Sequence, residues 1–209
     1  MVKIGLADNH PVVHYGIKSY FKEHSDISLT GIVDNFDMTE EMLKRKDIDV
    51  LLLDLELEGL TSINLVKSLL KSYPKTKIIL FSNLNEQIYA PNAIKAGVSS
   101  FVHKSEKLEN LASTILKVNR GAIIFSDAVK KNIALIARQP KSERLYRKLS
   151  SREIEVLRYL SNGKKNKEIA EILTLNEKTI STYKLRLLAK LNVTNLVDLV
   201  NKAKTLEIV

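Results

Sequence analysis

The chain has 209 residues, 44% of them hydrophobic and none of them cysteine, which allows one large domain or two small ones and excludes disulfide bonds, thiolate metal sites and a cysteine nucleophile. No apolar run is long enough to span a membrane, and the first residues lack the pattern of a secretory signal, so we expect a cytoplasmic protein with no membrane partner. The net charge of +9 falls entirely in residues 126–209, which predicts that this part binds a polyanion, a solvated basic surface being the alternative.

The first part of the chain, residues 1–122, alternates between short apolar segments and amphipathic ones. Such alternation predicts strands that alternate with helices, and hence a parallel sheet covered by helices on both faces. Pro91 lies inside the fourth predicted helix and should break or shorten it. The fold class expected here is an α/β doubly wound, five-stranded parallel sheet. The expected strands are 2–7, 27–33, 48–54, 77–82 and 99–104, and the expected helices are 11–23, 37–46, 61–73, a short helix ending at Gly97, and 107–119.

The pattern changes after Gly121. Residues 127–139 are typical of a helix and the polar, basic segment 140–148 is typical of a hinge, so we assign residues 123–147 to a linker. Everything from residue 148 to 209 is predicted to be helical, which gives an all-α domain of four helices. The predicted breaks lie near 162–163, 174–176 and 192–194.

Polar side chains with a possible common function follow four of the predicted strands. Asp8 ends the first strand and Asp54 ends the third. If the strand order is 2-1-3-4-5, these strands are neighbours, and their carboxyl ends bring both acids to one edge of the sheet. Ser82 ends the fourth strand and Lys104 ends the fifth. Carboxylates suit Mg²⁺, and a hydroxyl and an ammonium can hold phosphoryl oxygens, so the pattern predicts a cation site that also binds a phosphoryl group.

This arrangement resembles the receiver domain of two-component response regulators over about residues 1–122. The resemblance implies that Asp54 accepts a phosphoryl group from a sensor histidine kinase and that Ser82 and Lys104 contact the new phosphate. It implies a switch role for Phe101, the aromatic residue three positions before Lys104. It also implies a Mg²⁺ site at the acidic pair, here "ADNH". The residues that we assign to this metal site are Asp8, Asn9, Asp54 and Glu56.

The sequence departs from the receiver pattern at the second acid of the pair, where Asn9 stands. An amide oxygen can still ligate, but one negative charge is lost, which Glu56 can partly replace. A receiver phosphorylated on Asp54, a degenerate receiver regulated without phosphorylation and a Mg²⁺-dependent phosphohydrolase therefore stay open. The phosphohydrolase fits poorly, because no second general acid follows two residues after Asp54 in a usable position and no cap insertion is present. The four histidines show no ligand spacing, and we assign none of them to catalysis, so we expect a regulator and not an enzyme.

The second domain contains "LSSREIEVLRYLSNGKKNKEIAEILTLNEKTISTYKLRLLAKLNV". Ser150 or Ser151 can cap its first helix with Glu153 in the first turn, and Asn176 is a suitable N-cap for the third. Two helices around a short turn, the second with polar and basic residues at its start, are typical of a helix-turn-helix. Residues 149–200 resemble the LuxR-type helix-turn-helix, and the two domains together resemble the NarL/FixJ class of response regulators. The opening of the chain and "KTISTYK" are similar to the RcsB subgroup.

By this resemblance the third helix of the domain enters the major groove of DNA. Contacts to base edges specify sequence, whereas contacts to phosphates set affinity and its salt dependence. The last helix, 195–204, carries an apolar stripe that core packing or a second copy explains equally well. We predict a transcription regulator whose partners are DNA, a sensor histidine kinase and a second copy on DNA, a scaffold for a partner protein being the other interpretation. Residues expected at base edges are Lys178, Ser181, Thr182 and Leu185, and those expected near phosphates are Thr179, Lys184, Arg186 and Lys190.

Overall fold

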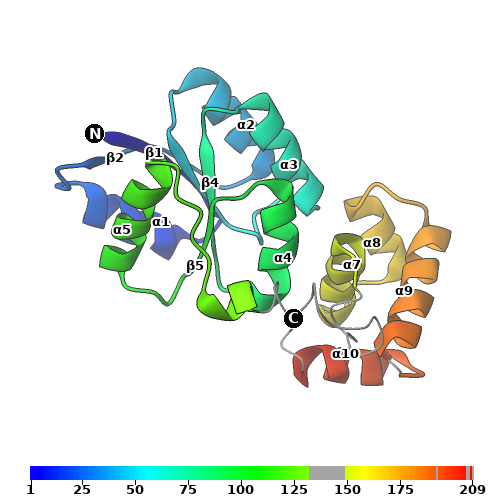
Figure 1. The fold of residues 1–209 in the computed structure, drawn as a ribbon. Helices are drawn as coiled ribbons and strands as arrows, with labels where there is room; N and C mark the ends of the chain where they lie inside the picture. The colour runs from blue at the N-terminus through cyan, green and yellow to red at the C-terminus, as the bar shows by residue number, and fades with distance from the viewer. Residues whose placement is uncertain (132–148, 192, 206–207, 209) are drawn as a thin grey trace. The chain divides into compact units, whose positions relative to one another are not determined.

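The computed structural model describes residues 1–131, 149–191, 193–205 and 208. The chain divides into two compact units, Met1–Lys131 and Asn132–Val209, each with its own buried hydrophobic side chains (Figure 1). The predicted hinge at 140–148, most of the predicted linker at 123–147 and the predicted helix beyond Lys131 lie outside the described residues.

The first unit is a five-stranded sheet in which all neighbouring strands are parallel, in the order β2-β1-β3-β4-β5. The predicted α/β class and strand order are therefore confirmed. The strands are β1 Val2–Ala7, β2 Ile27–Val33, β3 Val50–Leu53, β4 Lys77–Ser82 and β5 Ser100–His103. The helices are α1 Pro11–Phe21, α2 Phe36–Arg45, α3 Ile63–Ser72, α4 Glu86–Ala96 and α5 Leu108–Asn119.

Each face of the sheet has its own hydrophobic core. On one face, side chains of α2, α3 and α4 pack against the sheet, and on the other, side chains of α1 and α5 do so (Figure 1). The central strand β3 is fully buried because it has neighbours on both faces, with Leu51 and Leu53 pointing to one core and Val50 and Leu52 to the other. This two-sided burial explains the uninterrupted apolar run in the sequence. It also fixes the position at which the chain leaves the core, directly before Asp54.

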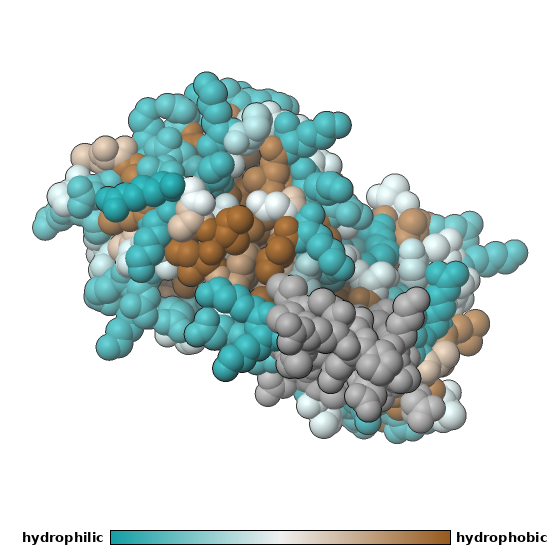
Figure 2. Space-filling view, viewed as in Figure 1, coloured by the Kyte–Doolittle hydropathy of each residue, from teal (hydrophilic) through white to brown (hydrophobic). Residues whose placement is uncertain are grey.

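The two outer strands of the sheet differ in how their edges are covered. In β2 the pairing with β1 shifts between Ile4 and Gly5, so that Thr30 forms a bulge, and its carbonyl oxygen accepts a hydrogen bond from Lys46 Nζ. At β5, Ile124 forms a parallel bridge with Ser100. Hydrophobic residues reach the surface around β5, between α4 and α5 (Figure 2).

The predicted break at Pro91 is wrong, because α4 runs through this residue without interruption. Proline removes one backbone N–H from the helix, but both helix ends are capped. The Asn85 side chain accepts a backbone N–H in the first turn, and Gly97, with φ of 99°, donates its own N–H to the last turn. Two alanines of α4 are fully buried against the sheet. Capping and packing thus outweigh the missing hydrogen bond.

The segment after α5 belongs to the first unit up to Lys131. Ile124 N donates to Ser99 O at 2.8 Å, and Phe125 and Val129 are buried in the core beside α4. The helix predicted from residue 127 begins there, and the structure describes it to Lys131. The compact unit therefore extends nine residues beyond the boundary that we predicted at residue 122.

The second unit contains α7 Ser151–Ser161, α8 Asn166–Ile172, α9 Glu177–Leu191 and α10 Leu196–Thr205. Ser150 and Glu153 form the predicted capping box, in which each side chain accepts a hydrogen bond from the other residue's backbone N–H. The Asn176 side chain accepts from Lys178 N at 2.8 Å and so caps α9, as predicted. Among the described residues, no helix of either unit has the length and apolar character needed to cross a membrane.

Candidate functional site

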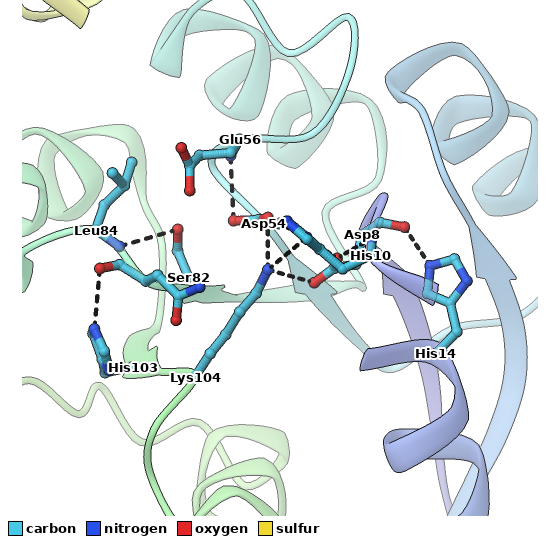
Figure 3. A network of polar contacts seen from close by, with 10 residues as sticks. Asp8, His10, His14, Asp54, Glu56, Ser82, Leu84, His103 and Lys104 are labelled. Atoms are coloured by element: carbon cyan, nitrogen blue, oxygen red, sulfur yellow. Dashed lines mark hydrogen bonds and ion pairs between the residues drawn. The ribbon is translucent and has the colours of Figure 1, made fainter. Parts of the chain in front are cut away.

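Two buried carboxylates meet at the carboxyl edge of the sheet (Figure 3). Asp8 directly follows Ala7 and Asp54 directly follows Leu53, and these two strand ends are paired in the register of β1 with β3. Backbone hydrogen bonds hold both acids in place, since Asp8 N donates to Val33 O at 3.0 Å and Asp54 N donates to Ala7 O at 2.9 Å. The side chains of both acids are fully buried. The predicted convergence of the two acids is confirmed.

The ammonium of Lys104 lies between these carboxylates. Lys104 Nζ is 2.8 Å from Asp8 Oδ2 and 2.7 Å from Asp54 Oδ2, and its side chain is 6% exposed. Burial opposes the charge and lowers the pKa of Lys104, but the hydrogen bonds and the charges of Asp54 and Asp8 outweigh burial and raise this pKa above its ordinary value. The ammonium therefore stays charged and neutralises part of the acid pair.

Ser82 and Phe101 occupy the neighbouring positions that the sequence predicted. Ser82 is the last residue of β4, is fully buried, and accepts a backbone hydrogen bond from Lys104 N at 3.1 Å. Phe101 lies in β5 with 7% exposure, in the core that contains the buried side of α4. The backbone of Ser82 is thus paired with that of Lys104, and the ring of Phe101 packs in the core shared by β5 and α4.

Asn9 and Glu56, which we also assigned to a metal site, differ from the buried carboxylates in their exposure to solvent. Both residues are exposed, and Glu56 does not belong to the cluster of His, Asp and Glu side chains found among the described residues. Glu56 contributes its backbone, whose N–H donates to Asp54 Oδ1 at 3.2 Å. That metal role stays a prediction for these two side chains, whereas Asp8 and Asp54 supply the carboxylate oxygens that suit a magnesium ion.

Two histidines for which the sequence predicted no role contact the site (Figure 3). His10 Nδ1 is 2.8 Å from Asp8 Oδ1, 3.7 Å from Asp54 Oδ2 and 3.3 Å from Lys104 Nζ. The Nε2 of His14, from α1, contacts the backbone oxygen of Asp8. The turn that brings His10 back to Asp8 was not evident in the sequence, and the only signal was the spacing of the two residues in "ADNHP".

The exposed side of α9 carries the residues predicted to contact DNA. Lys178, Thr182, Leu185 and Arg186 are exposed, whereas Thr179, Ser181, Lys184 and Lys190 are half-buried. Leu185 is 67% exposed although it is apolar, while the opposite side of α9 is buried in the bundle. A solvent-facing leucine among cations and hydroxyls is suited to contact the methyl group of a thymine.

Two of the predicted DNA contacts also have partners inside the bundle. Asn166 Nδ2, on α8, donates to Ser181 Oγ at 3.2 Å. Lys190 Nζ is 2.7 Å from Glu153 Oε2, which joins α9 to α7. Burial raises the pKa of Glu153, but hydrogen bonds from Lys190 and Ser150 outweigh burial and lower this pKa below its ordinary value. Lys190 therefore has a structural role in addition to any contact with a phosphate, which stays a prediction.

Both units, the one with the buried carboxylates and the one with α9, resemble domains of known proteins. A family model for the response regulator receiver domain matches residues 4–116, and one for bacterial regulatory proteins of the luxR family matches residues 147–203. The fimbriae Z protein of Salmonella typhimurium is 34% identical over 203 residues, which cover 97% of this chain and 96% of that protein. These matches are to regulatory proteins and not to enzymes.

Solved structures share the fold across both units. A structure of the Salmonella typhimurium RcsB response regulator matches with a TM-score of 0.80 at 24% identity, covering 99% of this chain and 98% of that chain. RcsB from Salmonella enterica serovar Typhimurium, bound to the promoter rprA in the presence of the phosphomimetic BeF3-, matches with a TM-score of 0.75 at 23% identity, covering 96% and 97%. With the receiver site on one unit and the helix-turn-helix on the other, the chain belongs to the response regulators that join a receiver domain to a LuxR-type DNA-binding domain, and it is a DNA-binding regulator of transcription.

Proposed function

We propose that a sensor histidine kinase phosphorylates Asp54 and that this modification controls the binding of α9 to DNA. The observation that carries the proposal is the position of Lys104, whose ammonium contacts both buried carboxylates at 2.7 and 2.8 Å. A phosphoryl group that reaches Asp54 meets this cation directly. Ser82, at the end of the adjacent strand β4, supplies a hydroxyl for another phosphoryl oxygen.

Transfer of a phosphoryl group to Asp54 brings the negative carboxylate close to the negative phosphoryl oxygens. An oxygen of the Asp54 carboxylate attacks phosphorus, the bond from phosphorus to the histidine nitrogen of the kinase breaks, and that nitrogen keeps the electron pair. Lys104 stabilises the charge on the transferred group, and the Glu56 N–H fixes the carboxylate from the other side. Asp8 and Asp54 would hold Mg²⁺, which supplies further positive charge to the phosphoryl oxygens.

For the output step, we propose that α9 enters the major groove with Lys178, Thr182 and Leu185 toward base edges. Their exposure supports this placement, and RcsB, which shares the fold, is solved on promoter DNA. A homodimer on DNA would match paired half-sites. In α10, Leu199 and Ala203 pack inside the bundle while Val197 is 69% exposed, so this helix has an apolar residue left for a second copy. A regulator acting on DNA in this way works in the cytoplasm.

A degenerate receiver, regulated without phosphorylation, is the second candidate. Asn9 stands in place of one acid at the edge of the sheet, and it is exposed. If two carboxylates hold the metal too weakly, the transfer to Asp54 is slow. The same experiment separates this function from the first.

The test is incubation of the full chain with acetyl phosphate and Mg²⁺, followed by measurement of the intact mass. We expect one added phosphoryl group, which Asp54→Ala abolishes and Asp26→Ala, a change at an exposed aspartate before β2, leaves intact. No adduct on the unmodified chain would favour the degenerate receiver. Rapid turnover of acetyl phosphate over many cycles would favour a phosphohydrolase.

A further inference from the structure

The side chain of His10 adds a nitrogen donor to the buried carboxylates. Its Nδ1 and carboxylate oxygens of Asp8 and Asp54 all lie within 4.8 Å of one another. A divalent ion needs its ligands within this range to bind them together. The backbone supports the arrangement, because His10 N also donates to Asp8 Oδ1 at 2.8 Å and the residue immediately precedes Pro11, the first residue of α1.

The cation that already lies at this point is the ammonium of Lys104. It is 2.8 Å from Asp8 Oδ2, 2.7 Å from Asp54 Oδ2 and 3.3 Å from His10 Nδ1. Two carboxylates and an imidazole nitrogen therefore surround a single positive charge. The ammonium marks the place where these side chains favour a cation, and a metal ion bound by all three donors would displace it.

Access to the cluster is through the imidazole. The carboxylate side chains are fully buried, whereas the His10 side chain is 49% exposed and therefore stands at the entrance. An ion that enters from solvent therefore meets the nitrogen donor of His10.

The nature of the donors decides which ions gain from this arrangement. Mg²⁺ demands oxygen ligands and keeps its waters, so an imidazole adds little to its binding. Zn²⁺ and related transition ions accept imidazole nitrogen readily, and a set of two carboxylates and one histidine is a common one for them. Binding to the ion requires that Nδ1 carry no proton.

We infer that His10 is a metal ligand of this receiver, and that it gives the site a preference for imidazole-binding divalent ions such as Zn²⁺ over Mg²⁺. The inference rests on the proposed function in so far as both place a divalent ion at Asp8 and Asp54. It goes beyond that function by naming a third ligand and the class of ion that this ligand selects.

The direct test is a long-range proton–nitrogen NMR spectrum of the full chain, selectively labelled on histidine, during titration with Zn²⁺. The chain has four histidines, so each ring can be assigned by substitution. We expect the Nδ1 resonance of His10 to move to the position of a metal-bound nitrogen at the first equivalent of Zn²⁺. Mg²⁺ should shift the backbone amides of Asp8 and Asp54 but leave that imidazole nitrogen unchanged.

Affinities from calorimetry complete the test. His10→Ala should weaken Zn²⁺ binding by roughly 10-fold or more, the scale of losing even an outer partner of a metal ligand, and should leave Mg²⁺ binding unchanged. His103→Ala is the matched control, because His103 lies at the same edge but contacts Ser105 and Asn83, and both affinities should persist. Asn9→Asp should strengthen Mg²⁺ binding and so reduce the preference for Zn²⁺.

Two results would overturn the inference: a Zn²⁺ affinity that His10→Ala leaves unaltered, or an Nδ1 resonance of His10 that does not respond to Zn²⁺. If Mg²⁺ still binds and acetyl phosphate still modifies Asp54 in that case, the proposed function stands and only the role of His10 is wrong. If neither ion binds and no adduct forms, both fail together. The amide spectrum of His10→Ala without metal verifies that the variant is folded.

Discussion

The charge of the buried site is balanced in only one of its states. Asp8, Asp54 and Lys104 together carry one net negative charge, and a divalent ion changes this to one net positive charge. A phosphoryl group carries up to about two negative charges and replaces the single charge of the Asp54 carboxylate. The phosphorylated, metal-bound site is therefore close to neutral. An acid in place of Asn9 would leave an excess negative charge, so the amide is compatible with the phosphorylated state.

A second buried charge lies in the DNA-binding unit at Glu153. The pKa of Glu153 is lowered in the folded chain, so the ionised carboxylate stabilises the fold. The contribution is present above the ordinary pKa of 4.5 and is lost as the pH falls through the lower value of the folded state. At neutral pH Glu153→Gln should therefore reduce the free energy of unfolding by about 1–3 kcal/mol, because Lys190 loses its charged partner.

Calorimetric unfolding between neutral pH and pH 3 measures this effect. The difference between the unmodified chain and Glu153→Gln should shrink as the carboxyl group becomes protonated. Glu171→Gln, at an exposed position of α8, should behave as the unmodified chain at every pH. A difference that stays constant with pH would mean that the variant acts through packing and not through the charge.

At this scale the sequence predicted which residues meet but not all of their neighbours. Asp8, Asp54 and Lys104 could be placed because each ends a strand, and the carboxyl ends of parallel strands share one edge. His10 could not, since the direction of its ring depends on the backbone of a short turn. The pair of Glu153 with Lys190, 37 residues apart, depends on how α7 and α9 pack.

The helix α4 contains a proline in its interior, where proline usually destabilises a helix. Pro91 leaves this helix without one backbone N–H, while its caps and buried alanines preserve it. Pro91→Ala restores the donor, so the free energy of unfolding of the receiver should rise by about 1–3 kcal/mol. Urea unfolding followed by circular dichroism measures the change.

The control for this variant is Lys95→Ala, an exposed substitution in the same helix, which should change stability by less than about 0.5 kcal/mol. Pro91→Ala could instead destabilise the receiver. That result would mean that the proline ring stabilises the protein, by lowering the conformational entropy of the unfolded chain, more than its missing hydrogen bond destabilises the helix. The predicted break was wrong because the prediction considered only the local effect of Pro91. The caps of α4 and the packing of its buried alanines also stabilise the helix.

The remaining elements followed the predicted pattern closely. The strands β1, β2 and β4 have the predicted bounds, because apolar runs delimited by polar turns mark them clearly. The segment after α5 did not, since burial of Phe125 and Val129 comes from contacts with a core that is distant in sequence. Short apolar runs next to a polar stretch are indistinguishable from a linker until the fold is known.

On the scale of the whole molecule, each unit should keep its own chemistry when the other is altered. Replacing both Lys178 and Thr182 by Ala should abolish sequence-specific DNA binding, because both side chains are exposed at the start of α9. The same double variant should still accept one phosphoryl group on Asp54. Electrophoretic mobility shifts on promoter fragments and intact mass measure the two outcomes.

Lys202→Ala, at an exposed position of α10, is the control and should retain the specific shift. Specific binding that survives the double change would place the recognition surface elsewhere on the unit. Loss of phosphorylation in the double variant would mean that the two units are not chemically separate. The charge distribution predicted the division of labour correctly, but the sequence-based boundary at residue 122 depended on composition and missed the packing that extends to Lys131.

The bulge at Thr30 has a consequence for how copies of this protein can meet. An outer strand with free backbone groups is a template on which another polypeptide can add, and bulges and lysines are means by which proteins prevent such aggregation. Here the bulge distorts β2, and Lys46 Nζ donates a hydrogen bond to the Thr30 carbonyl oxygen. On the opposite edge of the sheet, Ile124 forms a bridge with Ser100 of β5. Crowded copies should therefore avoid joining into continuous sheets, which leaves helices and loops as the surfaces for any reversible association of receivers.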